Sequence, residues 1–165
     1  MNAAAETNPD TDGWVRALGI DHGTVRIGVA VSDDIGLLAH PLETVPGTDP
    51  DRAAERIAEI ARNRRTEHLV VGLPLRLDGE EGSAVERVRA FVRRLRPHLP
   101  EGVAIHEVDE TLSTVSALEK LRAAGRRAKQ SKSIVDQAAA VEILQTWLDA
   151  RAGSPAFPSP YTPEP

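Results

Sequence analysis

The chain has 165 residues, which is enough for one domain with its own hydrophobic core. It contains no cysteine, which excludes disulfide bonds, thiolate zinc sites and a cysteine nucleophile. The net charge of −5 argues against indiscriminate binding of nucleic acid. No apolar run is long enough to span a membrane, and residues 1–13 do not resemble a signal peptide, so we expect a soluble, cytoplasmic protein without membrane contacts.

The hydrophobic pattern predicts three strands joined by turns, followed by strands that alternate with helices. The predicted strands span residues 15–21, 26–32, 40–45, 69–73 and 103–108. The predicted helices span about 51–64, 83–95, 114–124 and 133–150. This order predicts an α/β fold with a mixed five-stranded sheet in the order 3-2-1-4-5, flanked by helices, with strands 1, 4 and 5 parallel. Ser83 and Glu86 match a capping box at the start of the second helix.

Both ends of the chain are expected to be disordered. Residues 1–13 contain few apolar side chains, and residues 151–165 are rich in proline, which is incompatible with a helix or a central strand. The predicted domain therefore spans 14–150.

Acidic residues stand at the ends of two predicted strands. Asp21 closes the first strand, and Asp109 and Glu110 close the fifth. An aspartate before a turn also forms an ordinary Asx turn, and strand-end acids also cap helices. Neighbouring residues of an extended chain point to opposite sides, so we expect one of Asp109 and Glu110 to face the site. We favour Glu110, because its side chain is longer, and keep Asp109 as second choice.

Asp136 lies near the start of the last predicted helix. At 100° per residue it shares a direction with Ala139, Ala140, Ile143 and Trp147. The expected polar face of this helix is Gln137, Glu142, Gln145 and Asp149. The helix dipole also stabilises an acid in the first turn. This explains the position of Asp136 in the sequence but not its place on the apolar stripe. Acids that converge at one sheet edge can hold cations such as Mg²⁺, and a pair of such ions cuts phosphodiesters.

The segment 120–132 is basic in an otherwise acidic protein. Its basic residues are Lys120, Arg122, Arg126, Arg127, Lys129 and Lys132, and it contains no acid. Such a segment either contacts phosphates or forms a solvated helix end. The five histidines lack the spacing of a zinc site. Gly72, in the fourth strand, is expected to leave room between Asp21 and Glu110.

Four blocks of sequence resemble, in order, the YqgF/RuvX family. They are GIDHG at 19–23 with RIGVAVSD at 26–33, VVGLPL at 70–75, VDETLST at 108–114, and IVDQAAA at 134–140 with ILQ at 143–145. The chain has Thr111 where that family often has arginine, and His22 where it often has an apolar or small residue. Arg26 or the segment 126–132 is then expected to hold the phosphates.

The resemblance implies a ribonuclease-H-like fold and a nuclease that processes the 5′ end of the 16S ribosomal RNA precursor. It implies that Asp21, Glu110 (with Asp109) and Asp136 bind one or two Mg²⁺ or Mn²⁺ ions, and that the substrate is RNA, free or in a pre-ribosomal particle. Three alternatives stay open: a Holliday-junction resolvase, a non-catalytic ribosome-assembly factor, and an ATPase related to sugar kinases and actin. The chain is expected to be a monomer or a homodimer.

Overall fold

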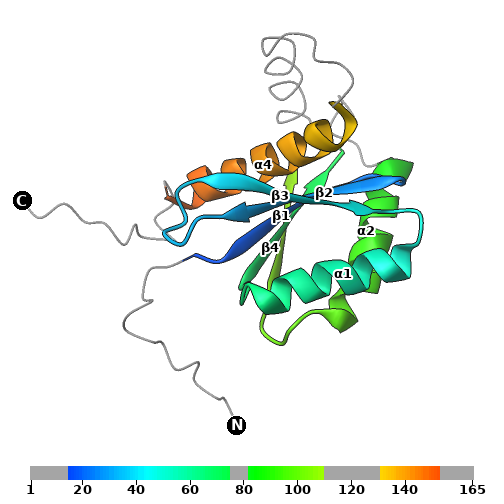
Figure 1. The fold of residues 1–165 in the computed structure, drawn as a ribbon, viewed down its shortest axis with the longest axis horizontal. Helices are drawn as coiled ribbons and strands as arrows, with labels where there is room; N and C mark the ends of the chain where they lie inside the picture. The colour runs from blue at the N-terminus through cyan, green and yellow to red at the C-terminus, as the bar shows by residue number, and fades with distance from the viewer. Residues whose placement is uncertain (1–14, 75–81, 110–130, 153–165) are drawn as a thin grey trace, which may run out of the picture.

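The computed structural model describes residues 15–74, 82–109 and 131–152, with the side chains of 131–136 and 152 outside the description. A five-stranded sheet in the order β3-β2-β1-β4-β5 forms the middle layer (Figure 1). Its strands are β1 Ala17–His22, β2 Arg26–Ser32, β3 Ala39–Pro46, β4 His68–Leu73 and β5 Ala104–Asp109. The helices are α1 Pro50–Asn63, α2 Ser83–Leu95, the 3₁₀ turn η2 Arg96–His98, and α4 Ser131–Ala152.

The fold class and strand order predicted from the sequence are confirmed. β1, β4 and β5 are parallel, whereas β1, β2 and β3 are antiparallel. The predicted helix 114–124 lies outside the described residues, as do the predicted disordered ends apart from residues 151 and 152, which end α4. Among the described residues, no helix has the length and apolar character that a membrane span requires.

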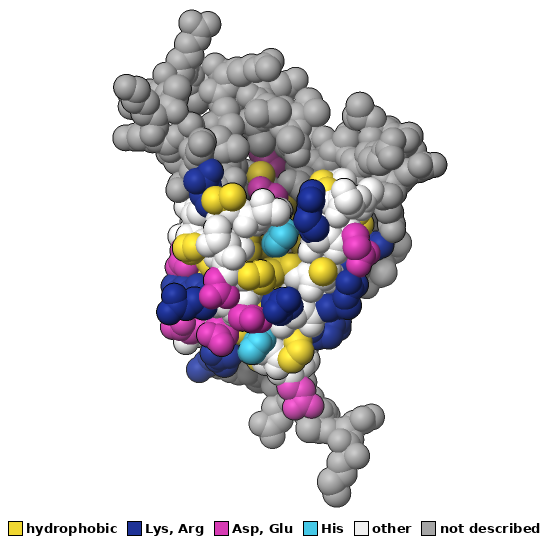
Figure 2. Space-filling model, turned by 90° about the vertical axis from the view of Figure 1, so that its right-hand side faces the viewer, with side chains coloured by type: hydrophobic (Ala, Val, Ile, Leu, Met, Phe, Trp, Pro, Cys, Tyr) yellow, Lys and Arg dark blue, Asp and Glu magenta, His cyan; other side chains and the backbone are white. Residues whose placement is uncertain are grey.

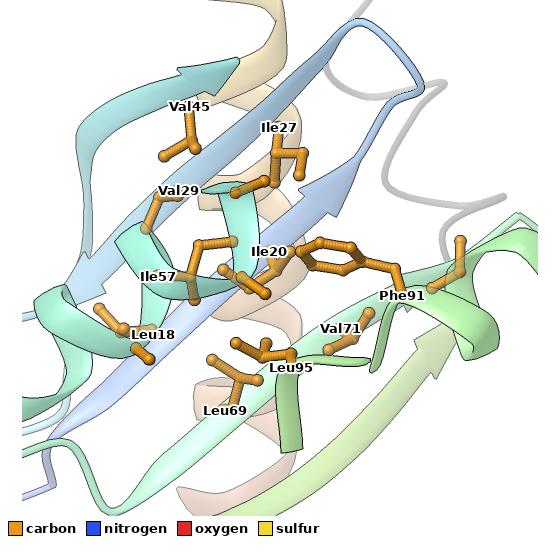
Figure 3. Close-up of a cluster of buried hydrophobic side chains, with 14 of the residues drawn as sticks. Leu18, Ile20, Ile27, Val29, Val45, Ile57, Leu69, Val71, Phe91 and Leu95 are labelled. Carbon is orange, nitrogen blue, oxygen red and sulfur yellow. The ribbon is translucent and has the colours of Figure 1, made fainter. Parts of the chain in front are cut away.

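Two hydrophobic cores lie on opposite faces of the sheet. On one face, Leu18 and Ile20 of β1 pack with α1 and α2, and Figure 3 shows these side chains beside Ile57, Phe91 and Leu95. On the other face, α4 covers the sheet through Ala140, Ile143 and Leu144 (Figure 1). Because side chains alternate along a strand, Ala17 and Gly19 of β1 lie on the α4 face.

Gly19 allows α4 to lie directly on the central strand. A Cβ atom at Gly19 would be 2.7 Å from the carbonyl oxygen of Ala140 and 2.7 Å from Cβ of Leu144. These distances are too short for any side chain, and one of the two atoms belongs to the helix backbone. Glycine at this position therefore sets the distance between α4 and β1.

Two glutamines of α4 bind β3 and the turn before it, which corrects the prediction that they belong to a solvent-facing polar stripe. The Ala39 N–H donates to Oε1 of Gln145, and Nε2 of Gln145 donates to the Leu37 carbonyl, both at 2.9 Å. Eight residues earlier, Nε2 of Gln137 donates to Oγ1 of Thr44 at 2.9 Å. These bonds hold both halves of α4 against β3.

The predicted capping box of α2 is wrong. Gly82 is the N-cap, with no side-chain hydrogen bond to the helix, and Ser83 is already the first helical residue. Glu86 instead pairs with Arg93, with its Oε1 2.7 Å from Nη2. Ser83 therefore has helical geometry and cannot act as the extended residue that a capping box requires.

β3 is an irregular edge strand. Val29 of β2 pairs with Glu43, but the next residue, Ala30, pairs with Pro41, so the register shifts by one residue at a bulge. Pro41 has no N–H, and Glu43 forms two hydrogen bonds with the guanidinium of Arg56 in α1.

An aromatic cluster lies near the amino end of β4 and β5. Nδ1 of His68 and Nε2 of His106 are 3.0 Å apart, and both rings lie within about 5 Å of the Trp147 ring. Burial lowers the pKa of His68 to about 4, with further lowering by His106 and Arg151. Burial also lowers the pKa of His106. The folded protein therefore prefers both rings neutral.

We expect replacement of Gly19 by alanine to destabilise the fold. The new methyl group overlaps the backbone of α4, and overpacking of this kind costs about 1–3 kcal/mol. Urea unfolding followed by circular dichroism measures the loss. Gly102→Ala is the control: its methyl group would meet nothing within 4 Å, so only the strain of its left-handed backbone, about 1 kcal/mol, is expected. An unchanged urea midpoint for Gly19→Ala would contradict the close contact.

We expect stability to fall as the pH drops from 6.5 toward 4. The folded pKa of His68 lies below the unfolded value of 6.5, so the unfolded chain takes up protons first and the stabilisation is lost progressively in this window. Urea unfolding at a series of pH values measures the slope. The double variant His68→Gln with His106→Gln should flatten it, whereas His98→Gln, at an exposed histidine, should not. Equal slopes in all three proteins would show that the pair is not responsible.

Candidate active site

The carboxyl ends of the parallel strands meet at one edge of the sheet, where Asp21 and Asp109 are found. Asp21 is the last residue but one of β1, and Asp109 is the last residue of β5. Figure 2 looks onto this end of the molecule and shows acidic, basic and histidine side chains on it. Ligands of open α/β sheets bind at this edge.

Asp21 lies on the α4 face and has glycine on both sides. It follows Ala17 and Gly19 in the alternation of β1. Its partner on β2 is Gly28, and on β4 the pair Ile20–Val71 brings Gly72 level with Asp21. The two strands next to Asp21 therefore present no side chain beside the half-buried carboxylate.

Asp109 lies on the opposite face from Asp21. It pairs in register with Leu73, which belongs to the core under α1 and α2. Two residues earlier, Glu107 pairs with Arg89 of α2 at 3.2 Å, which places the same side of β5 toward that helix. Glu110 lies outside the described residues.

The backbone of Asp136 lies close to the end of β1 that carries Asp21. α4 runs antiparallel to β1, since Gln137 binds β3 opposite Gly28 and Gln145 binds it at the other end. From the contact of Gly19 with Ala140, position 136 is one helical turn away, about 6 Å. Asp21 lies two residues from Gly19 in the same direction, about 7 Å.

The structure describes some of the predicted phosphate-binding residues. Arg26 is the first residue of β2 and shares a face with Gly28, and therefore with Asp21. Lys132 belongs to the first turns of α4. Arg126, Arg127 and Lys129 lie outside the described residues.

His22 follows Asp21 but belongs to the other face. Its ring contacts the ring of Phe91 in α2, with centroids 4.8 Å apart. Burial lowers the pKa of His22, Asp21 opposes this shift, and Arg87 adds to it. The folded protein therefore favours the neutral ring, which can donate or accept a hydrogen bond.

Residue types at this edge suit a hard divalent cation. Within residues 15–74, 82–109 and 131–152, no three His, Asp or Glu side chains are grouped to hold a metal ion. The set of Asp21, Glu110 and Asp136 falls partly outside that description. What is described fits Mg²⁺ or Mn²⁺: the Asp21 carboxylate lies between two glycines, at the edge where β5 ends and α4 begins.

The sequence did not identify Gly28, Thr44 and Gln137 as neighbours of the site. The register of the hairpin carries the signal for Gly28: pairing of His22 with Ile27 across the turn also pairs Asp21 with Gly28. Thr44 pairs with Gly28 and receives the hydrogen bond from Gln137. The sequence pattern does not predict this hydrogen bond, because it joins residues 93 positions apart.

Proteins with similar sequences are named as nucleases. A protein of Nocardia farcinica named as a proposed pre-16S rRNA nuclease is 53% identical over 154 residues, covering 88% of this chain and 84% of its own. A protein of Mycobacterium leprae with the same name is 48% identical over 146 residues, covering 86% and 77%.

Two solved structures share the fold. They are RuvC of Thermus thermophilus in complex with a Holliday junction substrate, with 20% identity, and the Fowlpox virus resolvase with Holliday junction DNA, with 9% identity. Each has a TM-score of 0.53 and covers 84% of this chain, and the match spans 96% and 99% of the respective structures. The family described as "RuvX: Holliday junction resolvase" matches residues 15–150. This chain therefore belongs to the RuvX family of nucleases.

Proposed function

We propose that this protein is a Mg²⁺- or Mn²⁺-dependent nuclease that hydrolyses a phosphodiester bond at the 5′ end of the 16S rRNA precursor in the cytoplasm. The position of Asp21 carries the proposal: a carboxylate at the end of the central strand, flanked by Gly28 and Gly72, under the helix that bears Asp136. The names of the relatives favour an RNA precursor as substrate, free or in a pre-ribosomal particle.

The chain's own acids have separate tasks in this proposal. Asp21, Glu110 and Asp136 hold one or two ions, which when bound activate water and stabilise charge on the phosphate oxygens. Asp109 is the less suitable ligand, because it lies on the face opposite Asp21. Arg26 and, from the basic segment, Arg126, Arg127, Lys129 and Lys132 hold the backbone of the substrate.

A Holliday junction is the second candidate substrate. The description of the matching family names resolvase activity, and cutting a junction symmetrically requires two active sites in a dimer. A four-way DNA junction assayed beside the RNA precursor, with the solution mass of the protein, separates the two substrates.

We expect Asp21→Asn to reduce cleavage by at least about 100-fold, because the amide has one neutral oxygen in place of the charged carboxylate. The assay follows Mn²⁺-dependent cutting of a labelled fragment that spans the 5′ end of the 16S precursor. Asp34→Asn, at an exposed turn residue, is the control and should cut normally. Removal of the metal with EDTA should stop wild-type cleavage. Undiminished cutting by Asp21→Asn would refute the proposal.

We expect Glu110 to matter more than Asp109. Glu110→Gln should lose cleavage to the same extent as Asp21→Asn, whereas Asp109→Asn should retain at least about a tenth of it, because position 109 lies on the α2 face. Cleavage rates at increasing Mn²⁺ concentration distinguish a lost ligand from a small change in local charge. The reverse order, with Asp109→Asn inactive and Glu110→Gln active, would show that the chain turns before position 110.

A further inference from the structure

α2 carries arginines at positions 87, 89, 93 and 94, and carboxylates hold the last three. Arg89 pairs with Glu107 at 3.2 Å, Arg93 with Glu86 at 2.7 Å and Arg94 with Asp51 at 2.7 Å. Within the described part of the chain, no carboxylate pairs with Arg87, and its side chain is exposed. Arg87 is therefore the cation of this helix that remains available to an external anion.

Arg87 lies beside the edge that carries Asp21. Phe91, whose ring contacts His22, is one turn further along α2, so Arg87 and Phe91 are neighbours on one side of the helix. Because α2 begins beyond the carboxyl end of β4, Arg87 lies about 6 Å nearer than Phe91 to the open end of the site. His22 thus stands between Asp21, its chain neighbour, and Arg87, and it interacts electrostatically with both.

We propose that Arg87, with His22 beside it, binds a phosphate of the nucleic-acid substrate next to the one that is cut. His22 and Arg87 lie toward α2, whereas Asp21 and Arg26 lie toward α4, so the two sets of residues hold different phosphates of one strand. A strand that crosses the edge contacts Arg26 and the acids on one side and Arg87 on the other. This inference rests on the proposed function, because it requires nucleic acid at this edge.

The chemistry of the two side chains suits a phosphate. A guanidinium binds two phosphate oxygens at once through parallel N–H groups. The ring of His22 offers one further N–H, and its contact with Phe91 fixes its position. Arg87 in this role is a positioning residue: it holds the strand and takes no part in bond cleavage.

Binding in the absence of metal tests this inference separately from catalysis. Fluorescence anisotropy in EDTA measures the affinity of the labelled 16S precursor fragment at several salt concentrations. Arg87→Gln should weaken binding several-fold and lower the slope of log K against log salt by about 0.7, the value for one phosphate of a single strand. Arg87→Lys keeps the charge and should keep the slope. Arg93→Gln, with the same charge change at a paired arginine of the same helix, is the matched control and should bind like wild type.

The outcomes separate this inference from the proposed function. In Mn²⁺, Arg87→Gln should raise KM and leave kcat nearly unchanged, with a circular dichroism melt that confirms folding. Suppose that Arg87→Gln lowers the salt slope but the wild-type protein cuts neither RNA nor the junction. The phosphate site is then supported and the nuclease function is rejected. An active wild type with an unchanged slope in Arg87→Gln would reject the phosphate site alone. Equal losses of affinity in Arg87→Gln and Arg93→Gln, or no binding of the fragment by the wild type, would also overturn the phosphate site.

Discussion

The contact between Gly19 and α4 is the constraint on which the arrangement of the site depends. The helix backbone rests on the central strand at a distance that only a residue without a side chain permits. A larger residue there would push α4 away from the sheet and strain the hydrogen bonds by which Gln137 and Gln145 attach it to β3. The position of Asp136 relative to Asp21 is thus fixed by packing that lies outside the site itself.

The alternation of side chains in β1 and β5 divides the chemistry of the edge between two faces. Asp21 and Arg26 belong to the face covered by α4, while His22 and Asp109 belong to the face covered by α1 and α2. Residues adjacent in sequence therefore serve different parts of the same edge. The proposed substrate, a nucleic-acid strand, is long enough to contact both faces at once.

The sequence predicted the elements and their order well, because hydrophobic alternation and turn residues are local signals. The connections between elements were harder to predict. Gln137 and Gln145 are polar and spaced for a solvent-facing stripe, yet both bind β3, and only the tertiary fold supplies their partners. The capping box at Ser83 failed because a neighbouring residue, Gly82, took the cap position. Gly28 of β2 could be placed beside Asp21 only from the register in which β1 and β2 pair, and the sequence alone does not specify that register.

The irregular β3 strand has a consequence for how two copies of the protein can associate. Exposed edge strands invite another chain to extend the sheet, and proteins prevent this with prolines, bulges and charges. β3 has all of these: Pro41 and Pro46 lack donors, the bulge opposite Val29 and Ala30 breaks the regular spacing, and Glu43 is charged. In addition, Gln145 occupies the N–H of Ala39. This border resists strand-by-strand aggregation, so a pair of molecules must form through another surface.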